Sequence, residues 1–465
     1  MKLVSPALKD FDCVNALKQL HSNYVIAPID KATGNVAVIC KRFYAMVLFK
    51  ELGVSDSSTT KTYEKFKTSI KTVVNNQKKI LKKNFNLDVS VENECLPHIY
   101  WLPKMHKKPC KFRFIIAAPK CSIKPLNKVI TAIFKLFFHQ IEKYNQKSHF
   151  YSGIKSFWVV ENNEAVLNSI GKLNRNRRAK CISTFDFSTL YTNIPHNKLI
   201  KVLNELIDFC FKGWEDKHIA VTKFGAKWVN DISKYDLVFS KEKVKDALKY
   251  LMSSCFFTLG NLLFKQVIGI PMGSDPAPFM ANLFLYFYEN KWLMELKRKD
   301  LVSARKFGNT FRFIDDLCAI NDGGLFEKHF QEIYPPELEL KKEHGNDSAT
   351  FLDLNIQIAE KQFSTCLFDK RDAFPFSIVR MPYRNSNIPT NMFYATFGSE
   401  ILRIGRTTSH RDDFLRSASS LLTRMRNQCA ESVSIGKVLR KMYGRHQVLH
   451  KFATNARTFT NLLTV

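Results

Sequence analysis

Two adjacent aspartates, Asp315 and Asp316, lie within the apolar stretch FRFIDDLCAI at residues 311–320. Carboxylates are costly to keep beside an apolar core unless a counter-charge compensates them. Asp186 occurs in a similar context, in STFDFSTLY at residues 183–191. An aspartate pair beside a third aspartate on a neighbouring strand can hold two divalent cations, the arrangement used for in-line phosphoryl transfer. Oxygen ligands without nitrogen or sulfur favour Mg²⁺.

An isolated pair of aspartates more often marks a turn or the start of a helix, so the neighbouring residues must decide. Tyr191 is an aromatic residue that closely follows the first aspartate. In GIPMGSDPAPFMANLF, Gly273 and Ser274 precede an apolar helical pattern, as expected where a backbone approaches a nucleotide or primer. Upstream, Lys104 and Arg113 are suited to triphosphate oxygens. These residues favour nucleotide chemistry over a simple turn.

Periodicity and turn residues predict the elements that position these side chains. We expect strand pairs within 96–118, 256–270 (turning at Gly260-Asn261) and 311–322, strands over 181–191 and 351–358, and helices over 125–145, 196–211, 279–297 and 325–333. Residues 61–85 hold eight lysines and one glutamate, and their apolar spacing predicts a basic amphipathic helix. Its charged face is either solvated or turned toward phosphates. The order of elements is not the regular βαβ alternation of a doubly wound sheet.

Charge is the dominant feature of the composition. The 465 residues include 71 Lys+Arg against 42 Asp+Glu, a net charge of +29. Such a surplus favours a polyanionic partner, because neutralising phosphates releases counterions. The alternative is a protein that uses lysine only for solubility. The 11 cysteines lack C-x-x-C or zinc spacing, which indicates reduced thiols. No stretch has the length of a membrane span and the first residues lack a signal-peptide pattern, so we expect an intracellular protein without a membrane partner.

The ordered set FRFIIAA, FDFSTLYTNIP, GIPMGSDPAPFMANLF, FRFIDDL and FLDLNIQI resembles a reverse transcriptase. More narrowly, the chain resembles the reverse transcriptases of Penelope-like retroelements, relatives of telomerase reverse transcriptase. IAPIDKATGNVAVICKRFY and YWLPKMHKKP are similar to the amino-terminal blocks of that group, and LFDKRDAFPFSIVRMPYRNSNIP and SEILRIGRTTSHRDDF to its post-palm region. The resemblance runs from about residue 25 to about residue 450.

This resemblance implies an α+β fold, a right-hand polymerase with palm, fingers and helical thumb. We expect a basic helical extension over 1–95, fingers over 96–180, a palm over 181–370 with an insertion near 212–250, and a thumb over 371–465. It implies an RNA-directed DNA polymerase that joins a dNTP to a primer 3′-OH. Its partners would be an RNA template, a DNA primer, the RNA–DNA duplex and dNTP, and its role would be in retrotransposon DNA integration. Basic runs such as RNRRAK favour a nuclear location or simply bind phosphate.

The resemblance also implies a role for each selected residue. Asp186, Asp315 and Asp316 would be catalytic and, with the carbonyl of Phe187, would hold two Mg²⁺ ions, for which Mn²⁺ can substitute. Tyr191 would be a steric gate against a ribose 2′-OH, or else a core aromatic. The nucleotide-binding set comprises Lys104, Arg113, Tyr191, Gln266, Gly273, Ser274, Lys341 and Lys342. Either of the last two is a candidate general acid for pyrophosphate or a solvated lysine. Lys107, Lys108 and Lys111 are neighbours that compete with Lys104 for its role.

Two features depart from the family pattern. Asp275 stands where an uncharged residue is expected, and it would add negative charge near the metals. No GIY-YIG endonuclease motif is recognisable, so we expect any endonuclease to be a separate partner. Two other functions compete: a catalytically silent or domesticated nucleic-acid-binding relic, and an RNA-dependent RNA polymerase. Intact carboxylates argue against the first, and Tyr191 argues against the second.

Overall fold

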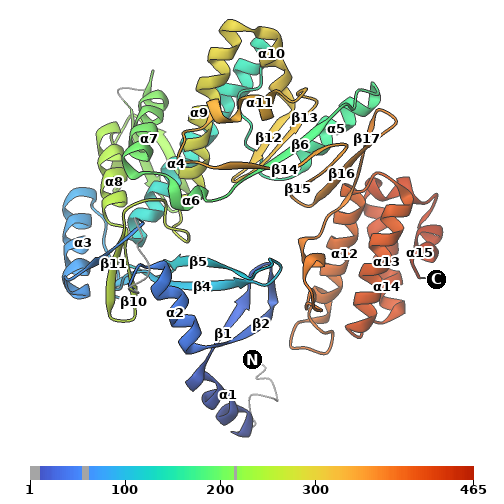
Figure 1. The fold of residues 1–465 in the computed structure, drawn as a ribbon, viewed down its shortest axis with the longest axis horizontal. Coiled ribbons are helices and arrows are strands. Elements are labelled where there is room, and N and C mark those ends of the chain that lie inside the picture. Colours follow the sequence, from blue (N-terminus) through green and yellow to red (C-terminus); the bar gives the residue numbers. More distant parts are fainter. Residues whose placement is uncertain (1–10, 55–61, 214–216, 465) are drawn as a thin grey trace.

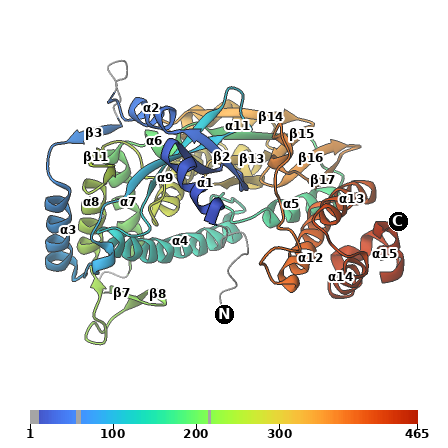
Figure 2. The ribbon, with the colours of Figure 1, turned by 90° about the horizontal axis from the view of Figure 1, so that it is seen from below.

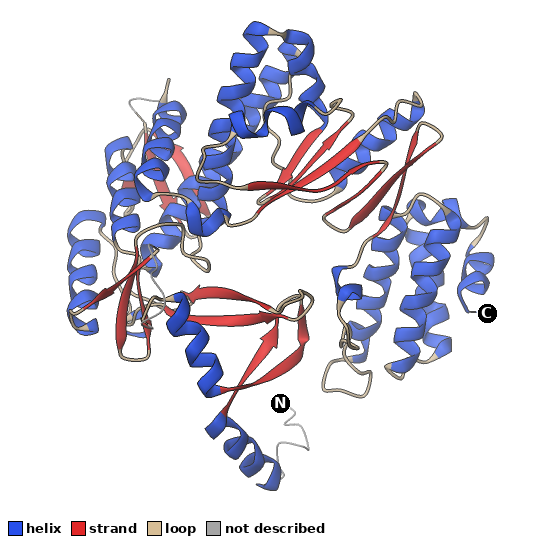
Figure 3. Cartoon of the chain, in the orientation of Figure 1, coloured by secondary structure: helices blue, strands red, loops and turns tan. Residues whose placement is uncertain are grey.

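The computed structural model describes residues 11–54, 62–213 and 217–464. In Figure 1 the elements follow one another around a ring, and the C-terminal helices come back beside the N-terminal strands. Figure 2 shows these helices as a separate group at one end of the molecule. In Figure 3 the strands of the upper part of the ring face its centre with helices on their outer side, and strands also border the centre in the lower part.

The N-terminal part combines helices with strands. Its elements are α1 (Phe11–Asn23), β1 (Tyr24–Ile29), β2 (Ala32–Cys40), α2 (Lys41–Glu51), β3 (Tyr63–Phe66), α3 (Ile70–Phe85) and a 3₁₀ turn (Val91–Asn93). The predicted helical extension over 1–95 therefore differs from the described part of that segment, which contains three strands. The predicted helix over 61–85 was wrong at its start. Ser69 caps α3, with its Oγ accepting from the Thr72 amide at 3.2 Å, and Tyr63 is buried against Phe257.

A five-stranded sheet connects this part to the centre, in the order β3-β11-β10-β4-β5. It consists of β3 with β4 (His98–Lys104), β5 (Lys111–Ala117), β10 (Phe256–Leu259) and β11 (Leu262–Gln266). The hairpin β10–β11 turns at Gly260-Asn261, as predicted. Helix α4 (Lys124–Ser152) is longer than predicted, and it ends at Gly153, whose φ of 68° suits glycine.

The central sheet has the order β12-β13-β6-β14. Its strands are β6 (Ile182–Phe187), β12 (Thr310–Phe313), β13 (Asp316–Ile320) and β14 (Leu340–Asn346). The helical elements of this part of the chain are α5 (Glu164–Arg175), α6 (Leu190–Asn193), α7 (His196–Phe211), α8 (Lys241–Ser253), α9 (Ala277–Lys299), α10 (Leu301–Lys306), a 3₁₀ turn (Phe307–Asn309) and α11 (Leu325–Ile333). The strands β7 (His218–Thr222), β8 (Gly225–Val229) and β9 (Val238–Phe239) form a small separate sheet in the segment predicted as an insertion.

The C-terminal part begins with a three-stranded sheet of β15 (Ser348–Phe351), β16 (Leu354–Ala359) and β17 (Gln362–Leu367). The single strand predicted over 351–358 is therefore a hairpin, which turns at Leu352 and Asp353. A 3₁₀ turn (Lys370–Ala373) precedes α12 (Thr390–Thr407), α13 (Arg411–Asn427), α14 (Ser432–Arg445), a 3₁₀ turn (Gln447–Phe452) and α15 (Ala456–Thr464). These helices have their own apolar core, in which Phe414 stacks on Phe452.

Two sequence expectations about the whole chain can be compared with the described residues. The ten cysteines whose side chains the structure describes are all free thiols. No helix among residues 11–54, 62–213 and 217–464 has the length and apolarity needed to cross a membrane.

Candidate active site

Strand alternation decides where the side chain of Asp186 points. In β6, Phe185 and Phe187 are buried in the large core that includes α9 and α11. Because neighbouring residues of a strand face opposite sides, Asp186 lies on the other face of the sheet. In Figure 1, α9 and α11 are above this sheet and the centre of the ring is below it. Asp186 is therefore on the side of the sheet that faces the centre of the ring.

The sheet register brings the three predicted carboxylates together. Asp316 is directly opposite Asp186 in the antiparallel pair of β13 and β6, so their side chains share a face. Asp315 occupies the two-residue bend between β12 and β13, and its carbonyl accepts from the Phe187 amide at 3.2 Å. One carboxylate oxygen from each aspartate lies within 4.8 Å of the other two. This all-oxygen set fits divalent cations such as Mg²⁺.

The bend that holds Asp315 is strained. Ile314 has a φ of 55°, a left-handed conformation that is a true outlier for a β-branched residue. A buried network fixes the bend: Arg312 donates to the Ile314 carbonyl at 3.1 Å and forms an ion pair with Glu289 of α9. Glu289 also accepts from the Tyr334 hydroxyl at 2.8 Å. Strain of this kind persists only where the surrounding structure enforces it, and it concentrates at functional sites.

The carboxylates repel one another in a desolvated setting. Burial, together with the charges of Asp315 and Asp316, raises the pKa of Asp186 to about 6. Burial also raises the pKa of Asp316 to about 6, with Asp315 and Glu343 adding to the shift and Lys370 opposing it. Two neighbouring carboxylates with raised pKa values indicate a missing positive charge, which a bound cation would supply.

Two residues near the carboxylates were missed from the sequence. Glu343 and Lys370 line a small cavity with Asp316, and both act on the pKa values of the aspartates. Glu343 lies at an irregularity in the register of β14, between Lys342 and His344. Lys370 begins the 3₁₀ turn after β17. Lys370 lies in LFDKRDAFPF, part of the post-palm block that resembles the family, so the sequence does contain a signal for it.

Tyr191 lies close to the carboxylates. It belongs to the one-turn helix α6, and burial together with the charge of Asp315 raises the pKa of its hydroxyl to about 12. Its carbonyl accepts from the amide of Ile270 at 2.6 Å, which connects α6 to the loop containing Gly273 and Ser274. The predicted gate residue and the predicted nucleotide loop are therefore in direct contact.

The loop with Gly273 packs closely on β5. Gly273 has a φ of 113°, and a Cβ there would lie 2.5 Å from the carbonyl oxygen of Ile116. The Ile116 amide donates to the Met272 carbonyl at 2.8 Å. Ser274 begins the turn that leads into α9. Gln266 is buried, its Nε2 donates to the Ile268 carbonyl at 2.9 Å, and its Oε1 has no partner among the described residues.

Lys104 and Arg113 lie on the β4–β5 hairpin rather than on the sheet that carries the carboxylates. Arg113 is near Asp30 of the N-terminal hairpin, with Nε 3.3 Å from its Oδ1. Asp30 was missed from the sequence; it is buried and its second oxygen is unpartnered among described residues. Burial and the charge of Arg113 lower the pKa of Lys104. Lys104 is paired with Lys111 across the hairpin, so this end of the hairpin concentrates positive charge.

The structure separates the two candidate general acids. Lys341 is opposite Asp186 in the pair of β14 and β6, on the face of the carboxylates, although its Nζ also lies 3.0 Å from Glu339. Lys342 is opposite Phe185, and its Nζ is 2.6 Å from Glu327 of α11. Of the two lysines predicted as candidate general acids, Lys341 is therefore the one on the face of the carboxylates.

Asp275 does not leave an uncompensated charge at the start of α9. Its Oδ1 lies 2.8 Å from Nζ of Lys124, the first residue of α4, and both side chains are largely buried. The expectation that Asp275 adds free negative charge near the metals therefore needs correction, because the ion pair offsets that charge.

Comparisons with known proteins agree with this architecture. Residues 105–334 match the sequence model of the family described as reverse transcriptase (RNA-dependent DNA polymerase). A search of curated proteins finds no match. Telomerase from Candida albicans, solved in complex with the TWJ fragment of telomeric RNA, aligns with 99% of this chain and 74% of its own at a TM-score of 0.61 and 12% identity. Apo telomerase from Candida tropicalis aligns with 98% of this chain and 77% of its own at a TM-score of 0.50 and 11% identity. The predicted α+β right-hand polymerase fold is confirmed.

Proposed function

We propose that this chain is an RNA-directed DNA polymerase that transfers a nucleotide from a dNTP to a primer 3′-OH. One observation carries the proposal: Asp186, Asp315 and Asp316 converge within 4.8 Å inside a polymerase fold. A turn residue or a capping residue has no reason to meet two other carboxylates on a shared, desolvated face. The match of residues 105–334 to the reverse transcriptase family supports the same activity.

The residues fit a divalent metal centre. All the donors are oxygens, and burial together with the neighbouring carboxylates raises the pKa values of Asp186 and Asp316, a shift that bound cations would offset. When bound, a pair of Mg²⁺ ions, or Mn²⁺ in their place, would activate the primer hydroxyl and neutralise the leaving pyrophosphate. Asp186 and Asp315 would be the principal ligands of these ions, the Phe187 carbonyl would be a further ligand, and Asp316 would support them.

The remaining residues position the nucleotide. Tyr191, beside Asp315, would close the space that a ribose 2′-OH needs and so select deoxynucleotides. Gly273 allows the loop before α9 to approach β5, which presents the backbone of Ser274 to the nucleotide or template. Lys104 and Arg113 would hold the triphosphate, and Asp30 would orient the guanidinium of Arg113. In phosphoryl transfer the protein contributes mainly such positioning, together with electrostatic stabilisation of the developing charge.

The finer assignments belong to the same proposal. Residues 96–180 would be the fingers, 181–370 the palm and 371–465 the thumb on the primer–template duplex. The parent element would be a Penelope-like retroelement, with any endonuclease supplied by a separate chain and with the enzyme acting in the nucleus. The order of the five sequence blocks and the similarity to telomerase folds support this origin.

Primer extension on an RNA template tests the activity. Wild type, Asp315→Ala and the control Asp236→Asn, an exposed residue outside the site, are compared with Mg²⁺ and with Mn²⁺. Loss of a metal ligand removes several kcal/mol of transition-state stabilisation, so extension by Asp315→Ala should fall more than about 100-fold. The control should extend normally. Equal extension by all three proteins would contradict the assignment of Asp315.

The same assay separates the competing functions. A silent nucleic-acid-binding relic would bind RNA in a salt-sensitive manner without incorporating dNTP under either metal. An RNA-dependent RNA polymerase would incorporate NTP in preference to dNTP. Preferred dNTP incorporation supports the proposal against both.

A further inference from the structure

Residues 374–383, called the strap here, cross from the 3₁₀ turn after β17 to the C-terminal helices. On one side the strap meets the N-terminal hairpin: the Val379 amide donates to Asn35 Oδ1 at 2.7 Å, and Phe374 packs with Ile29 and Ala32. A Cβ on Gly34 would lie 2.4 Å from the Val379 carbonyl oxygen. On its other side the strap meets α13. It thus connects the two ends of the ring seen in Figure 1.

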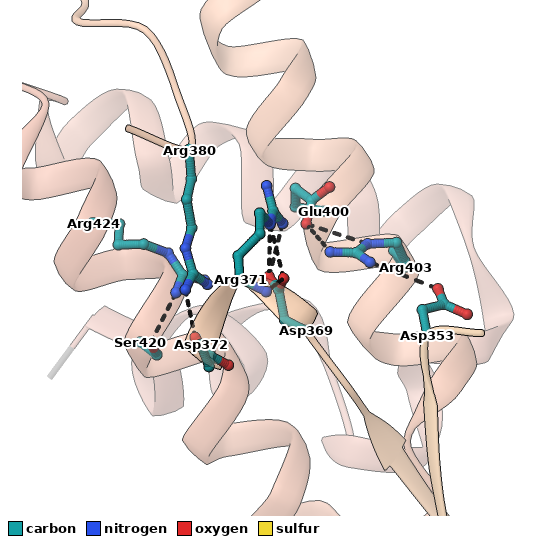
Figure 4. A network of polar contacts seen from close by, with 9 residues as sticks. All are labelled: Asp353, Asp369, Arg371, Asp372, Arg380, Glu400, Arg403, Ser420 and Arg424. Carbon is teal, nitrogen blue, oxygen red and sulfur yellow. Dashed lines mark hydrogen bonds and ion pairs between the residues drawn. The ribbon is translucent and has the colours of Figure 1, made fainter. Parts of the chain in front are cut away.

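Three arginines gather where the strap meets α13. Arg371 precedes the strap, Arg380 lies in it and Arg424 comes from α13, as Figure 4 shows. The guanidinium of Arg371 donates three hydrogen bonds of 2.8 to 3.1 Å to the carboxylate of Asp369. Arg380 bonds to both Asp369 and Asp372. Asp369 and Asp372 therefore neutralise the guanidinium groups of Arg371 and Arg380.

Arg424 is the third arginine of this cluster. Its Nη1 donates to the hydroxyl of Ser420 at 3.2 Å, and no carboxylate among the described residues forms an ion pair with it. Burial and the adjacent charge of Arg380 lower the pKa of Arg424, although Asp369 and Asp372 partly offset this. Arg424 is half buried beside two other guanidinium groups, so an anion at this place would relieve the repulsion among them.

The space beside Arg424 is a concavity of about 460 Å³ between the strap and the end of α13. Besides the arginines, its lining includes Phe376 and Tyr383, which are 37% and 54% exposed, and Gln428. Gln428 Oε1 is buried and unpartnered among the residues that the structure describes. An anion alone would leave that acceptor unsatisfied, whereas a nucleotide offers a base amino group or a hydroxyl as a donor.

We propose that this concavity binds a nucleotide of single-stranded nucleic acid, with its phosphate on Arg424 and its base against Phe376 or Tyr383. Arginine–phosphate contacts combined with exposed aromatic rings are how proteins hold unpaired strands. In a duplex the base faces are covered by neighbouring base pairs and cannot stack on these rings. The proposal rests on the proposed function only in taking nucleic acid as the partner.

Binding without catalysis tests the site. Fluorescence anisotropy with a labelled single strand and with a duplex of equal length is measured in EDTA between about 50 and 200 mM salt. The variant is Arg424→Gln, and the control is Arg416→Gln, which makes the same change at an exposed residue of the same helix. Tyr383→Leu tests stacking at a mostly exposed side chain, and thermal melting verifies that each variant is folded.

We expect Arg424→Gln to weaken single-strand binding severalfold and to reduce the salt slope by about 1, the signature of one lost phosphate contact. Tyr383→Leu should weaken binding by about five- to 160-fold, since stacking contributes about 1–3 kcal/mol per base. Duplex binding and the control should not change. Unchanged single-strand binding in both variants, or equal losses for strand and duplex, would overturn the proposal.

Inorganic phosphate distinguishes the two sources of the anion. If phosphate alone protects wild type against thermal unfolding as well as the oligonucleotide does, the site holds a free anion and the nucleotide assignment is overturned. Because no dNTP is present, a failed primer-extension assay leaves this result intact. Loss of the Arg424 effect likewise leaves the carboxylate assignment intact.

Discussion

Arg312 and Glu289 form an ion pair whose side chains have no exposed surface, and Arg312 also donates to the carbonyl of Ile314. The pair therefore connects the core helix α9 to the bend that carries Asp315. Glu289 accepts from Tyr334 as well, and burial and that charged partner keep the pKa of the Tyr334 hydroxyl far above its usual value.

Replacing Arg312 by Met should destabilise the protein by about 3–5 kcal/mol, because Glu289 is left as a buried, uncompensated charge. The double variant Arg312→Met/Glu289→Met should recover most of that loss, since an apolar pair of similar volume often replaces a buried ion pair. Primer extension should stay low in the double variant, because the bond to the Ile314 carbonyl is still missing. Chemical denaturation and extension rates check this, with Arg305→Met on the surface of α10 as the control. If the double variant recovered both stability and primer extension, the ion pair would not be what positions the bend.

Stability without metal should fall as pH rises through the range from about 4 to about 6. In the folded protein Asp186 and Asp316 have pKa values of about 6, so they retain protons that the unfolded chain has already lost. The free energy of unfolding therefore decreases as pH rises through this range. Above about pH 6 the destabilisation is fully present. Asp186→Asn should therefore melt higher than wild type at about pH 7.5 in EDTA, and the difference should vanish near pH 4.

The same melting experiment reports on the metal. Mg²⁺ should raise the melting temperature of wild type at about pH 7.5, where the carboxylates are ionised, and much less at about pH 5. The melting temperature of Asp186→Asn should respond weakly to Mg²⁺ at both pH values. An equal response of wild type and variant would place the stabilising ion elsewhere.

Gly273→Ala should impair nucleotide binding. The new Cβ would lie 2.5 Å from the Ile116 carbonyl oxygen, and the φ of 113° is unfavourable for alanine. We expect the substitution to destabilise the native conformation of the loop by about 1–3 kcal/mol, and the loop can relieve this strain only by moving away from β5. The KM for dNTP should rise. Gly308→Ala is the matched control, because a Cβ there meets nothing within 4 Å. Similar kinetics for the two variants would argue against close packing of the loop.

Tyr191→Ala should relax sugar selection. Removing the ring opens the space for a 2′-hydroxyl, so the preference for dNTP over NTP should fall by about 10- to 100-fold, the usual range for discrimination by shape. Single-nucleotide incorporation of each substrate, compared through kcat/KM, measures the change. If the ratio stays constant while both rates fall, Tyr191 is a core aromatic and not a gate.

The sequence predicted those parts of the fold that local patterns determine. Strand alternation around Asp186, the turn at Gly260-Asn261 and the helix over 196–211 all follow from residues close together in the chain. The three carboxylates could be predicted because each lies in a short motif that is recognisable from its own neighbouring residues. The nucleotide-binding roles remain predictions.

Long-range pairing was beyond the sequence. Residues 63–66 have the spacing of a helix but form a strand, because β11 offers them an edge far along the chain. Lys124 and Asp275 meet across 151 residues, and Glu289 and Arg312 each resemble ordinary surface residues until their helix and strand pack. Lys370 approaches Asp316 only because the three-stranded sheet folds back. None of these contacts has a periodic signature.

The junction of Asn35 with Val379 joins positions 344 residues apart, yet it consists of a few hydrogen bonds and a small apolar cluster. Such a junction is worth on the order of a few kcal/mol, within the range of local openings that folded proteins sample. The nucleic-acid strand that we propose as the partner would therefore need no free end, because it could enter from the side when the contacts between the N-terminal hairpin and the strap open briefly. The Val379 amide should accordingly exchange with solvent faster than the amides of β6, and a bound strand should slow that exchange.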